Sequence, residues 1–192
     1  MGTRNLTMVV LNGETKIAQY GQWDGYPSGQ GLTILNLLKT FDLSIFRKKV
    51  AMLRWLTDKE CDQLNETDWK KQHPYLSRDV GGKIIGIVYD GKLCNITLEK
   101  TTIELDIKIL GLINEESFAK NSAFCEWGYV INLDNNVLEV YKGLNKSPLT
   151  ETDRFYGPSQ YGYYPIKEVA RFDLNNLPSD EVFLNQTQHI KL

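Results

Sequence analysis

Cysteine and histidine are scarce in this chain of 192 residues, which contains three cysteines and two histidines. Cys61, Cys94 and Cys125 are far apart, and none of them belongs to a Cys-x-x-Cys pair. A structural zinc site needs four clustered ligands at defined spacings, so the sequence predicts no metal centre of this kind. Few, widely spaced cysteines are typical of proteins that work in a reducing cytoplasm.

Long apolar runs and blocks of a single charge are missing as well. The longest apolar run, 84–89, is too short to span a bilayer, and residues 1–5 lack the features of a signal peptide. The chain has 22 basic and 24 acidic side chains, and its densest basic run, 47–49, is typical of a solvated helix face. A duplex-binding protein usually shows a concentrated basic face. We therefore predict a cytoplasmic protein that binds neither membranes nor duplex nucleic acid.

The most distinctive segment is 20–31, which reads Tyr-Gly-Gln-Trp-Asp-Gly-Tyr-Pro-Ser-Gly-Gln-Gly. Four glycines give its backbone unusual freedom, and Pro27 fixes one φ angle. The three large aromatics beside this backbone are either plugs of a hydrophobic core or walls of a binding surface.

The first half of the chain predicts a hairpin followed by helices. Strand-like residues 6–11 and 15–20 flank Asn12-Gly13, the strongest short hairpin signal. Leucines at helical spacing predict a helix over 30–39, and Asp42 or Ser44 can cap a second helix that extends to Leu56. A short helix near 58–66 is expected next, and then a helix over 82–89 that Gly91 ends as its C-cap.

The second half predicts mostly strands. Alternating apolar residues indicate a strand over 103–109, and 125–133 and 137–143 form a second hairpin around an Asp-Asn-Asn turn. One more strand is expected over 164–172, followed by a short C-terminal helix or tail. Strands grouped apart from helices indicate an α+β fold, with an antiparallel sheet covered by helices, in a single domain over 1–192.

Several of these segments resemble a family of uncharacterised proteins found in bacteriophages and, more distantly, in bacteria and fungi. The resemblance is carried by 3–7, 16–20, 21–31 and the second hairpin. The order of elements also resembles part of the N-terminal-nucleophile hydrolase fold, which implies a degenerate αββα sandwich. The phage resemblance implies a protein that acts against host defence in the bacterial cytoplasm.

An N-terminal nucleophile itself is not predicted. That chemistry needs Ser, Thr or Cys at the mature N-terminus, so that the free amine can act as the base. Removal of Met1 would expose Gly2, and Thr3 would stay internal. Cys125 has no recognisable histidine partner and is interpreted as a small buried hydrophobe. An amide or nucleotide hydrolase that uses Arg4, Asp24 and Glu126 stays as the alternative.

A ligand pocket built on the aromatic loop is the leading hypothesis. Trp23 and Tyr26 could stack on a planar base or sugar, and Asp24 could accept its hydrogen bonds. The loop runs into a helix, whose first N–H groups can hold an anion such as phosphate. No Walker or dinucleotide fingerprint occurs, so no cofactor is predicted. The full expected set is Arg4, Tyr20, Trp23, Asp24, Tyr26, Ser28, Gln30 and Glu126, with Arg4 as the expected partner of Glu126. In the alternative, the aromatics plug the sheet–helix interface.

A second aromatic segment, 155–164, is rich in tyrosine and glycine. Such loops make adaptable contact surfaces, and Tyr156, Tyr161 and Tyr163 are the expected partner-binding residues. The partner could be a host protein or another copy in a homo-oligomer; the alternative is that the tyrosines lie flat on the core. Together these patterns favour a non-catalytic binding protein that holds a nucleotide-like molecule or a host defence protein, with a pure interaction module as the remaining class.

Overall fold

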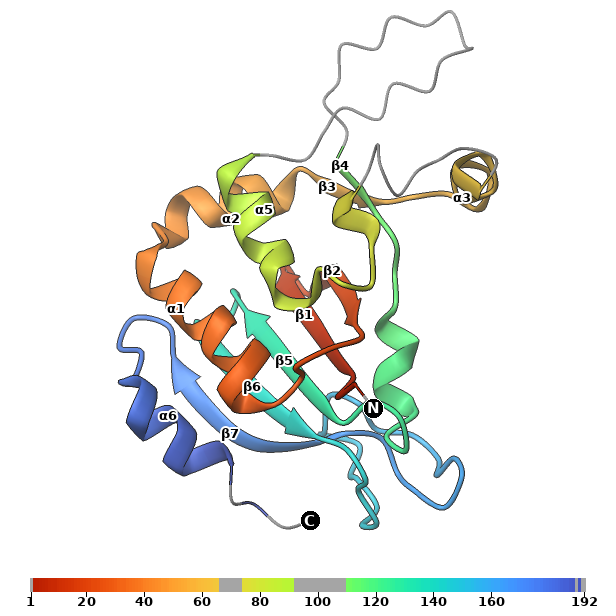
Figure 1. Cartoon of the computed structure of the whole chain (residues 1–192), viewed down its shortest axis with the longest axis vertical. Helices are drawn as coiled ribbons and strands as arrows, with labels where there is room; N and C mark the ends of the chain where they lie inside the picture. The colour runs from red at the N-terminus through yellow and green to blue at the C-terminus, as the bar shows by residue number, and fades with distance from the viewer. Residues whose placement is uncertain (1, 66–73, 92–109, 189, 191–192) are drawn as a thin grey trace, which may run out of the picture.

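The fold is built around a mixed sheet of five strands in the order β2-β1-β5-β6-β7 (Figure 1). The computed structural model describes residues 2–65, 74–91, 110–188 and 190. The strands of this sheet are β1 (Asn5–Leu11), β2 (Glu14–Gly21), β5 (Trp127–Asn132), β6 (Val137–Lys142) and β7 (Lys167–Asp173). A second sheet pairs two short strands, β3 (Leu53–Trp55) and β4 (Leu110–Leu112). The α+β class is confirmed, and the strand predicted over 103–109 lies outside the described residues.

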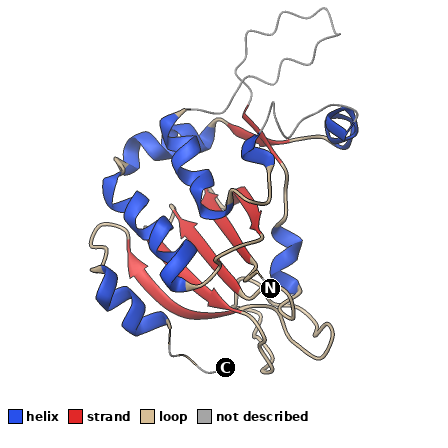
Figure 2. Cartoon of the chain, viewed as in Figure 1, coloured by secondary structure: helices blue, strands red, loops and turns tan. Residues whose placement is uncertain are grey.

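Helices cover one face of the large sheet (Figure 2). The helical elements are η1 (Pro27–Gly31), α1 (Leu32–Thr40), α2 (Leu43–Ala51), α3 (Asp58–Asn65), η2 (Pro74–Leu76), η3 (Gly81–Lys83), α5 (Ile84–Asp90), η4 (Glu116–Lys120) and α6 (Asp180–Thr187). The core on this face combines apolar side chains of α1, α2, α5 and α6 with side chains from all five strands. Among the described residues, no helix is both long enough and apolar enough to cross a membrane.

Local signals in the sequence fix several of these elements. The turn between β1 and β2 has φ angles of 56° at Asn12 and 73° at Gly13, which an Asn-Gly pair adopts readily. The Asp42 side chain caps α2 by accepting from two backbone amides, and Gly91 ends α5 at a φ of 70°. These predictions are confirmed. The second helix, however, ends at Ala51, because Leu53 leaves it to pair with β4.

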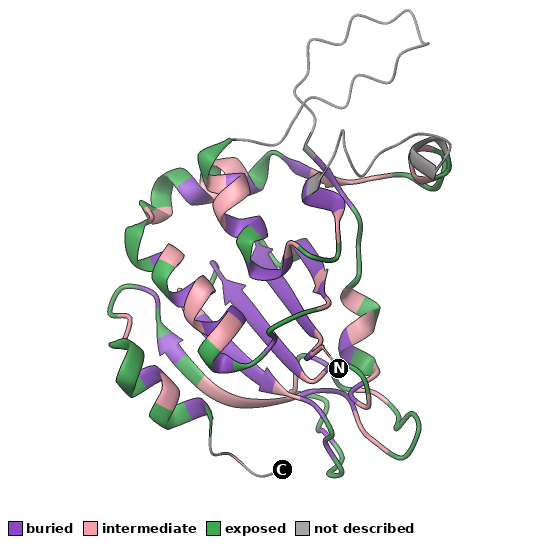
Figure 3. Cartoon of the chain, viewed as in Figure 1, coloured by how far each residue is buried: buried purple, intermediate pink, exposed green. Residues whose placement is uncertain are grey.

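The pairing of β1 with β5 corrects the prediction of an antiparallel sheet. These two central strands run parallel, with Asn5 opposite Trp127 and Val10 opposite Asn132. A parallel pair requires a crossover connection, which the long helical segment between β2 and β5 provides. Because β1 lies between β2 and β5 and has layers on both faces, all seven of its residues are buried (Figure 3).

The opposite face of the sheet carries η4 and the segment 144–166. Side chains of β1, β5 and β6 pack there against Ala119, Leu149, Phe155 and Ile166. In the described part of the chain this face therefore has a short helix and a long loop, and not the second stacked sheet that the hydrolase-like sandwich implies.

A carboxylate joins the turns of the two hairpins. Asp134 accepts hydrogen bonds from the backbone amides of Asn12 at 2.7 Å and Gly13 at 2.8 Å. We expect Asp134→Ala to lower the free energy of unfolding by about 1 kcal/mol, because two amides lose a charged acceptor that water replaces only in part. Urea unfolding would measure this against Asp62→Ala, a control at an exposed position with no hydrogen bond to its side chain within the described residues. Equal losses of unfolding free energy in the two variants would mean that the hydrogen bonds to Asp134 contribute nothing to stability.

Candidate functional site

The residues expected to form a ligand pocket gather around the start of β1, but they do not face one space. Trp23 and Gln30 contact the segment around η3, through Asp79 and the amide of Gly82. Arg4 instead places its guanidinium 4.7 Å from the ring centre of Phe124, next to the segment 144–166. The cavity described below is lined by other residues.

The aromatic loop is fastened to the sheet by its own backbone. The amide of Gly25 donates to the carbonyl of Thr3 at 2.9 Å, and the hydroxyl of Tyr129 donates to the carbonyl of Gly25 at 2.8 Å. The buried amide group of Asn5 donates to the carbonyls of Gly21 and Trp23, both at 3.3 Å. The segment 20–31 therefore has a clear structural role, since its backbone is held around the first residues of β1.

The predicted anion site at the start of the helix is not available. The amides of Gly29 and Gly31 both donate to the carbonyl of Tyr26, and the amide of Gln30 donates to the carbonyl of Asp24. This π-helical turn uses the N–H groups that a phosphate would need. Ser28 and the aromatic rings of Trp23 and Tyr26 remain exposed at its surface, whereas Gln30 is buried.

The expected ion pair between Arg4 and Glu126 is replaced by a different contact. Glu126 accepts from the backbone amide of Arg4 at 3.2 Å, while the Arg4 guanidinium lies over Phe124. The Tyr20 hydroxyl donates to Gln22 at 2.7 Å, and its pKa is raised mainly by burial. Cys125 is fully buried, and burial raises the pKa of its thiol, as expected for a small hydrophobe and unlike a nucleophile.

A polar cavity of about 460 Å³ lies over β6 and β7, at one edge of the sheet and on the face opposite the helices. This volume falls within the range of small-molecule sites. Glu139 and Tyr141 of β6 and Glu168 and Arg171 of β7 form one wall, and the segment 149–155 forms the other. The lining residues are Asn135, Glu139, Tyr141, Leu149, Thr152, Asp153, Arg154, Phe155, Ile166, Glu168 and Arg171.

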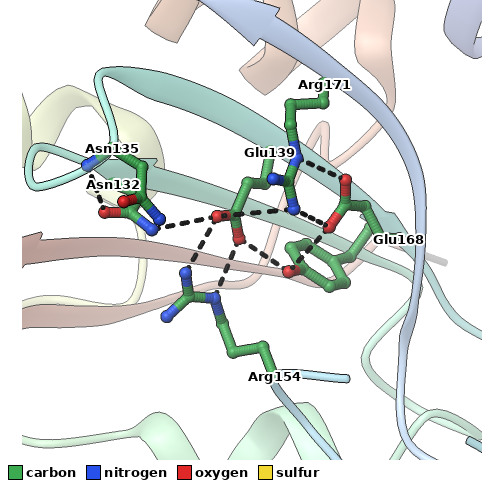
Figure 4. Close-up of polar contacts among 7 residues, drawn as sticks. Asn132, Asn135, Glu139, Arg154, Glu168 and Arg171 are labelled. Carbon is green, nitrogen blue, oxygen red and sulfur yellow. Dashed lines mark hydrogen bonds and ion pairs between the residues drawn. The ribbon is translucent and has the colours of Figure 1, made fainter. Parts of the chain in front are cut away.

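Glu139 is the centre of this site (Figure 4). It is 1 % exposed, and its carboxylate accepts four hydrogen bonds. Nε and Nη2 of Arg154 donate to its two oxygens at 2.8 Å each. The Tyr141 hydroxyl donates at 2.7 Å and the Asn132 amide at 3.2 Å. A carboxylate can be buried at tolerable cost only when it is paired in this way.

A second ion pair lies at the rim of the cavity. Nε and Nη2 of Arg171 donate to the two oxygens of Glu168 at 2.8 Å each, and Arg171 is 4.0 Å from Glu139. The Tyr141 oxygen is 3.4 Å from Glu168 and 2.7 Å from Glu139. Since a phenol has one proton, Tyr141 donates its hydrogen bond to the nearer carboxylate, which is that of Glu139. Its hydroxyl oxygen therefore lies between the two ion pairs and is bonded to one of them.

Protonation in the site follows from burial and pairing. Burial alone would raise the pKa of Glu139, but the hydrogen bonds from Arg154 and Tyr141 and the charge of Arg154 outweigh it, and the pKa is lowered. Burial and the Glu139 carboxylate raise the pKa of Tyr141. Burial alone would lower the pKa of Arg154, but Glu139 raises it. At neutral pH the site therefore holds fixed charges and a neutral phenol.

These features suit binding better than proton transfer. A general base needs a pKa near the working pH and a free lone pair. Glu139 has a lowered pKa, and its oxygens already accept from three side chains. The cavity lining has three carboxylates and two guanidinium groups, so it offers both acceptors and donors with little net charge.

No family model, curated protein or solved structure matches this chain significantly.

Proposed function

We propose that the protein is a non-catalytic binding protein that holds a small polar ligand in the cavity over β6 and β7. The observation that carries this proposal is the buried carboxylate of Glu139, held by three side chains at the cavity wall. A buried ion pair contributes little to stability compared with apolar side chains of similar volume. Convergent polar groups with shifted pKa values in a concave site are, in contrast, a common mark of binding sites.

The charges of the lining favour an uncharged, hydroxyl-rich ligand such as a sugar or a nucleoside. A hydroxyl group can donate to Asp153 or Glu168 and accept from Arg154 or Arg171, all of which line the cavity. A phosphate would meet three carboxylates, and the positive charges of both guanidinium groups are already balanced by Glu139 and Glu168. A neutral hydroxyl needs only a donor, and Nη1 of each arginine makes no hydrogen bond within the described residues. The cavity therefore favours a nucleotide-like ligand less than an uncharged one. The phage resemblance supports a role in which capture of a host molecule interferes with defence.

A thermal-shift screen tests this proposal with sugars, polyols and nucleosides, each beside its phosphorylated form. A ligand at about a hundred times its Kd raises the free energy of unfolding by about 2.7 kcal/mol. We expect uncharged members to raise the melting temperature more than their phosphorylated forms, because the lining has an excess of one carboxylate. Asp153→Asn should abolish the shift, since it removes a charged acceptor from the cavity.

Asp24→Asn is the matched control. Asp24 lies outside the cavity, in the aromatic loop, at a φ of 54° that asparagine tolerates well. The change is chemically the same, so the ligand shift should survive it. A shift that Asp24→Asn removes and Asp153→Asn leaves intact would place the ligand at the aromatic loop and contradict the proposed site.

A further inference from the structure

Three side chains from distant parts of the sequence form a ladder beside the start of β1. The Arg4 guanidinium lies 4.7 Å from the ring centre of Phe124, and the ring of Tyr161 meets Phe124 edge-on, with centres 6.1 Å apart. Phe124 and Tyr161 are both exposed. We call Arg4, Phe124 and Tyr161 the cation–aromatic ladder. It shares no residue with the polar cavity.

The backbone presents Tyr161 at the tip of a tight turn. Gln160 and Tyr163 exchange backbone hydrogen bonds of 2.7 Å and 3.0 Å, and the two residues between them have φ angles of 52° and 79°. Glycine and asparagine favour such angles, whereas a bulky aromatic adopts them rarely and at a cost. Tyr161 nevertheless occupies this position with 77 % of its surface exposed. Strain that places a large aromatic in solvent is typical of a functional position.

The surroundings of the ladder carry unpaired positive charge. Arg4, Arg78 and Lys146 make no ion pair within the described residues, although the whole chain has a net charge of −2. Lys146 lies over the ring of Tyr163, 5.9 Å from its centre. The charges of Arg4 and Arg78 both act on Tyr20, together with the single carboxylate of Glu115, so two cations face one anion there. The only carboxylate that contacts Arg4 in this part of the structure is Glu126, through the backbone amide.

We propose that the cation–aromatic ladder, with Lys146 beside it, is a docking surface for an acidic protein segment. Tyrosine and arginine are among the side chains that most often anchor protein partners, and unpaired cations complement carboxylates. Tyr161 is exposed, and Arg4 is half-buried. Single-stranded nucleic acid needs open ring faces on which bases can stack. Arg4 covers one face of Phe124, and Tyr161 meets that ring at 82°, so the ladder offers no parallel pair of open faces.

Selection of a displayed random-peptide library on the intact protein tests this surface. We expect the enriched peptides to be rich in Asp and Glu, and their binding to weaken as salt is added. Tyr161→Asn and Arg4→Gln should each raise the Kd by about tenfold or more, which corresponds to the loss of one anchor. Met52→Asn, at an exposed apolar residue at the end of α2 and outside the ladder, should leave the Kd unchanged.

Tyr161→Asn also separates binding from folding. Asparagine before Gly162 suits the turn better than tyrosine, so this variant should melt at the same temperature as the parent or higher. Lost binding with kept stability would support the docking surface. A selection without acidic enrichment, or Kd values that Tyr161→Asn does not change, would overturn the proposal. Binding of a fluorescent oligothymidylate that depends on Tyr161 and Arg4 would also overturn it, in favour of single-stranded nucleic acid.

Discussion

Replacing Glu139 with alanine is expected to lower the free energy of unfolding by about 3 kcal/mol. The variant leaves the guanidinium of Arg154, whose side chain is only 25 % exposed, without its bidentate partner. It also leaves the buried Tyr141 hydroxyl without its nearest acceptor. Urea unfolding of the parent and the variant measures the loss.

The double variant Glu139→Leu with Arg154→Met is the control for this effect. Apolar side chains of similar volume often replace a buried ion pair without loss, so the double variant should recover most of the stability. Its ligand binding, in contrast, should be lost. A single variant as stable as the parent would show that Glu139 is not buried and paired as described.

The free energy of unfolding should also depend on the protonation of Glu139 in acid. The pKa of Glu139 is lower in the folded protein than the ordinary value of 4.5, so it stabilises the fold above that ordinary pKa. This contribution is lost as the pH falls through the lowered folded pKa. Glu139→Gln removes the titrating group, so its unfolding free energy should fall less steeply below about pH 4.5 than that of the parent.

Gly29→Ala is expected to destabilise the protein by about 2 kcal/mol or more. A Cβ atom on Gly29 would lie 2.3 Å from the carbonyl oxygen of Asp24, which is fixed backbone. The turn that holds the aromatic loop would have to open. Thermal or urea unfolding measures the effect.

Gly157→Ala is the matched control for this substitution. The nearest atoms to a Cβ atom on Gly157 are 3.8 Å and 3.9 Å away, so alanine fits and the change should be close to neutral. If the two variants were equally stable, Gly29 would not be packed as tightly as described. The glycines of the aromatic loop would then need another explanation.

Much of the secondary structure could be predicted because its signals are local. Asn12-Gly13 defines the first hairpin, Asp42 begins α2, and Gly91 ends α5, each through residues that are neighbours in the sequence. The parallel pairing of β1 with β5 could not be predicted this way. It joins residues more than a hundred positions apart, and no local pattern specifies the direction of the connection.

The site was harder to predict for the same reason. Glu126 is the carboxylate that the sequence analysis predicts to face inward and to need a partner, whereas Glu139 carries no such prediction. Glu139 stands between Leu138 and Val140 in a predicted strand, which was a usable signal of a buried charge. Its partner Arg154 lies in a loop without periodicity, so no spacing rule connects the two residues. The close packing of the aromatic loop requires its glycines, but their N–H groups, which the sequence predicts to be free for an anion, donate to backbone carbonyls.

The measurement that we would make first is backbone NMR of the protein titrated with the strongest uncharged ligand from the thermal-shift screen. We expect the amide shifts to change around 152–155, 168 and 171, the residues that line the cavity. Changes confined to 23–31 would contradict the proposed site and return the ligand to the aromatic loop. The absence of any change would contradict small-molecule binding at the cavity.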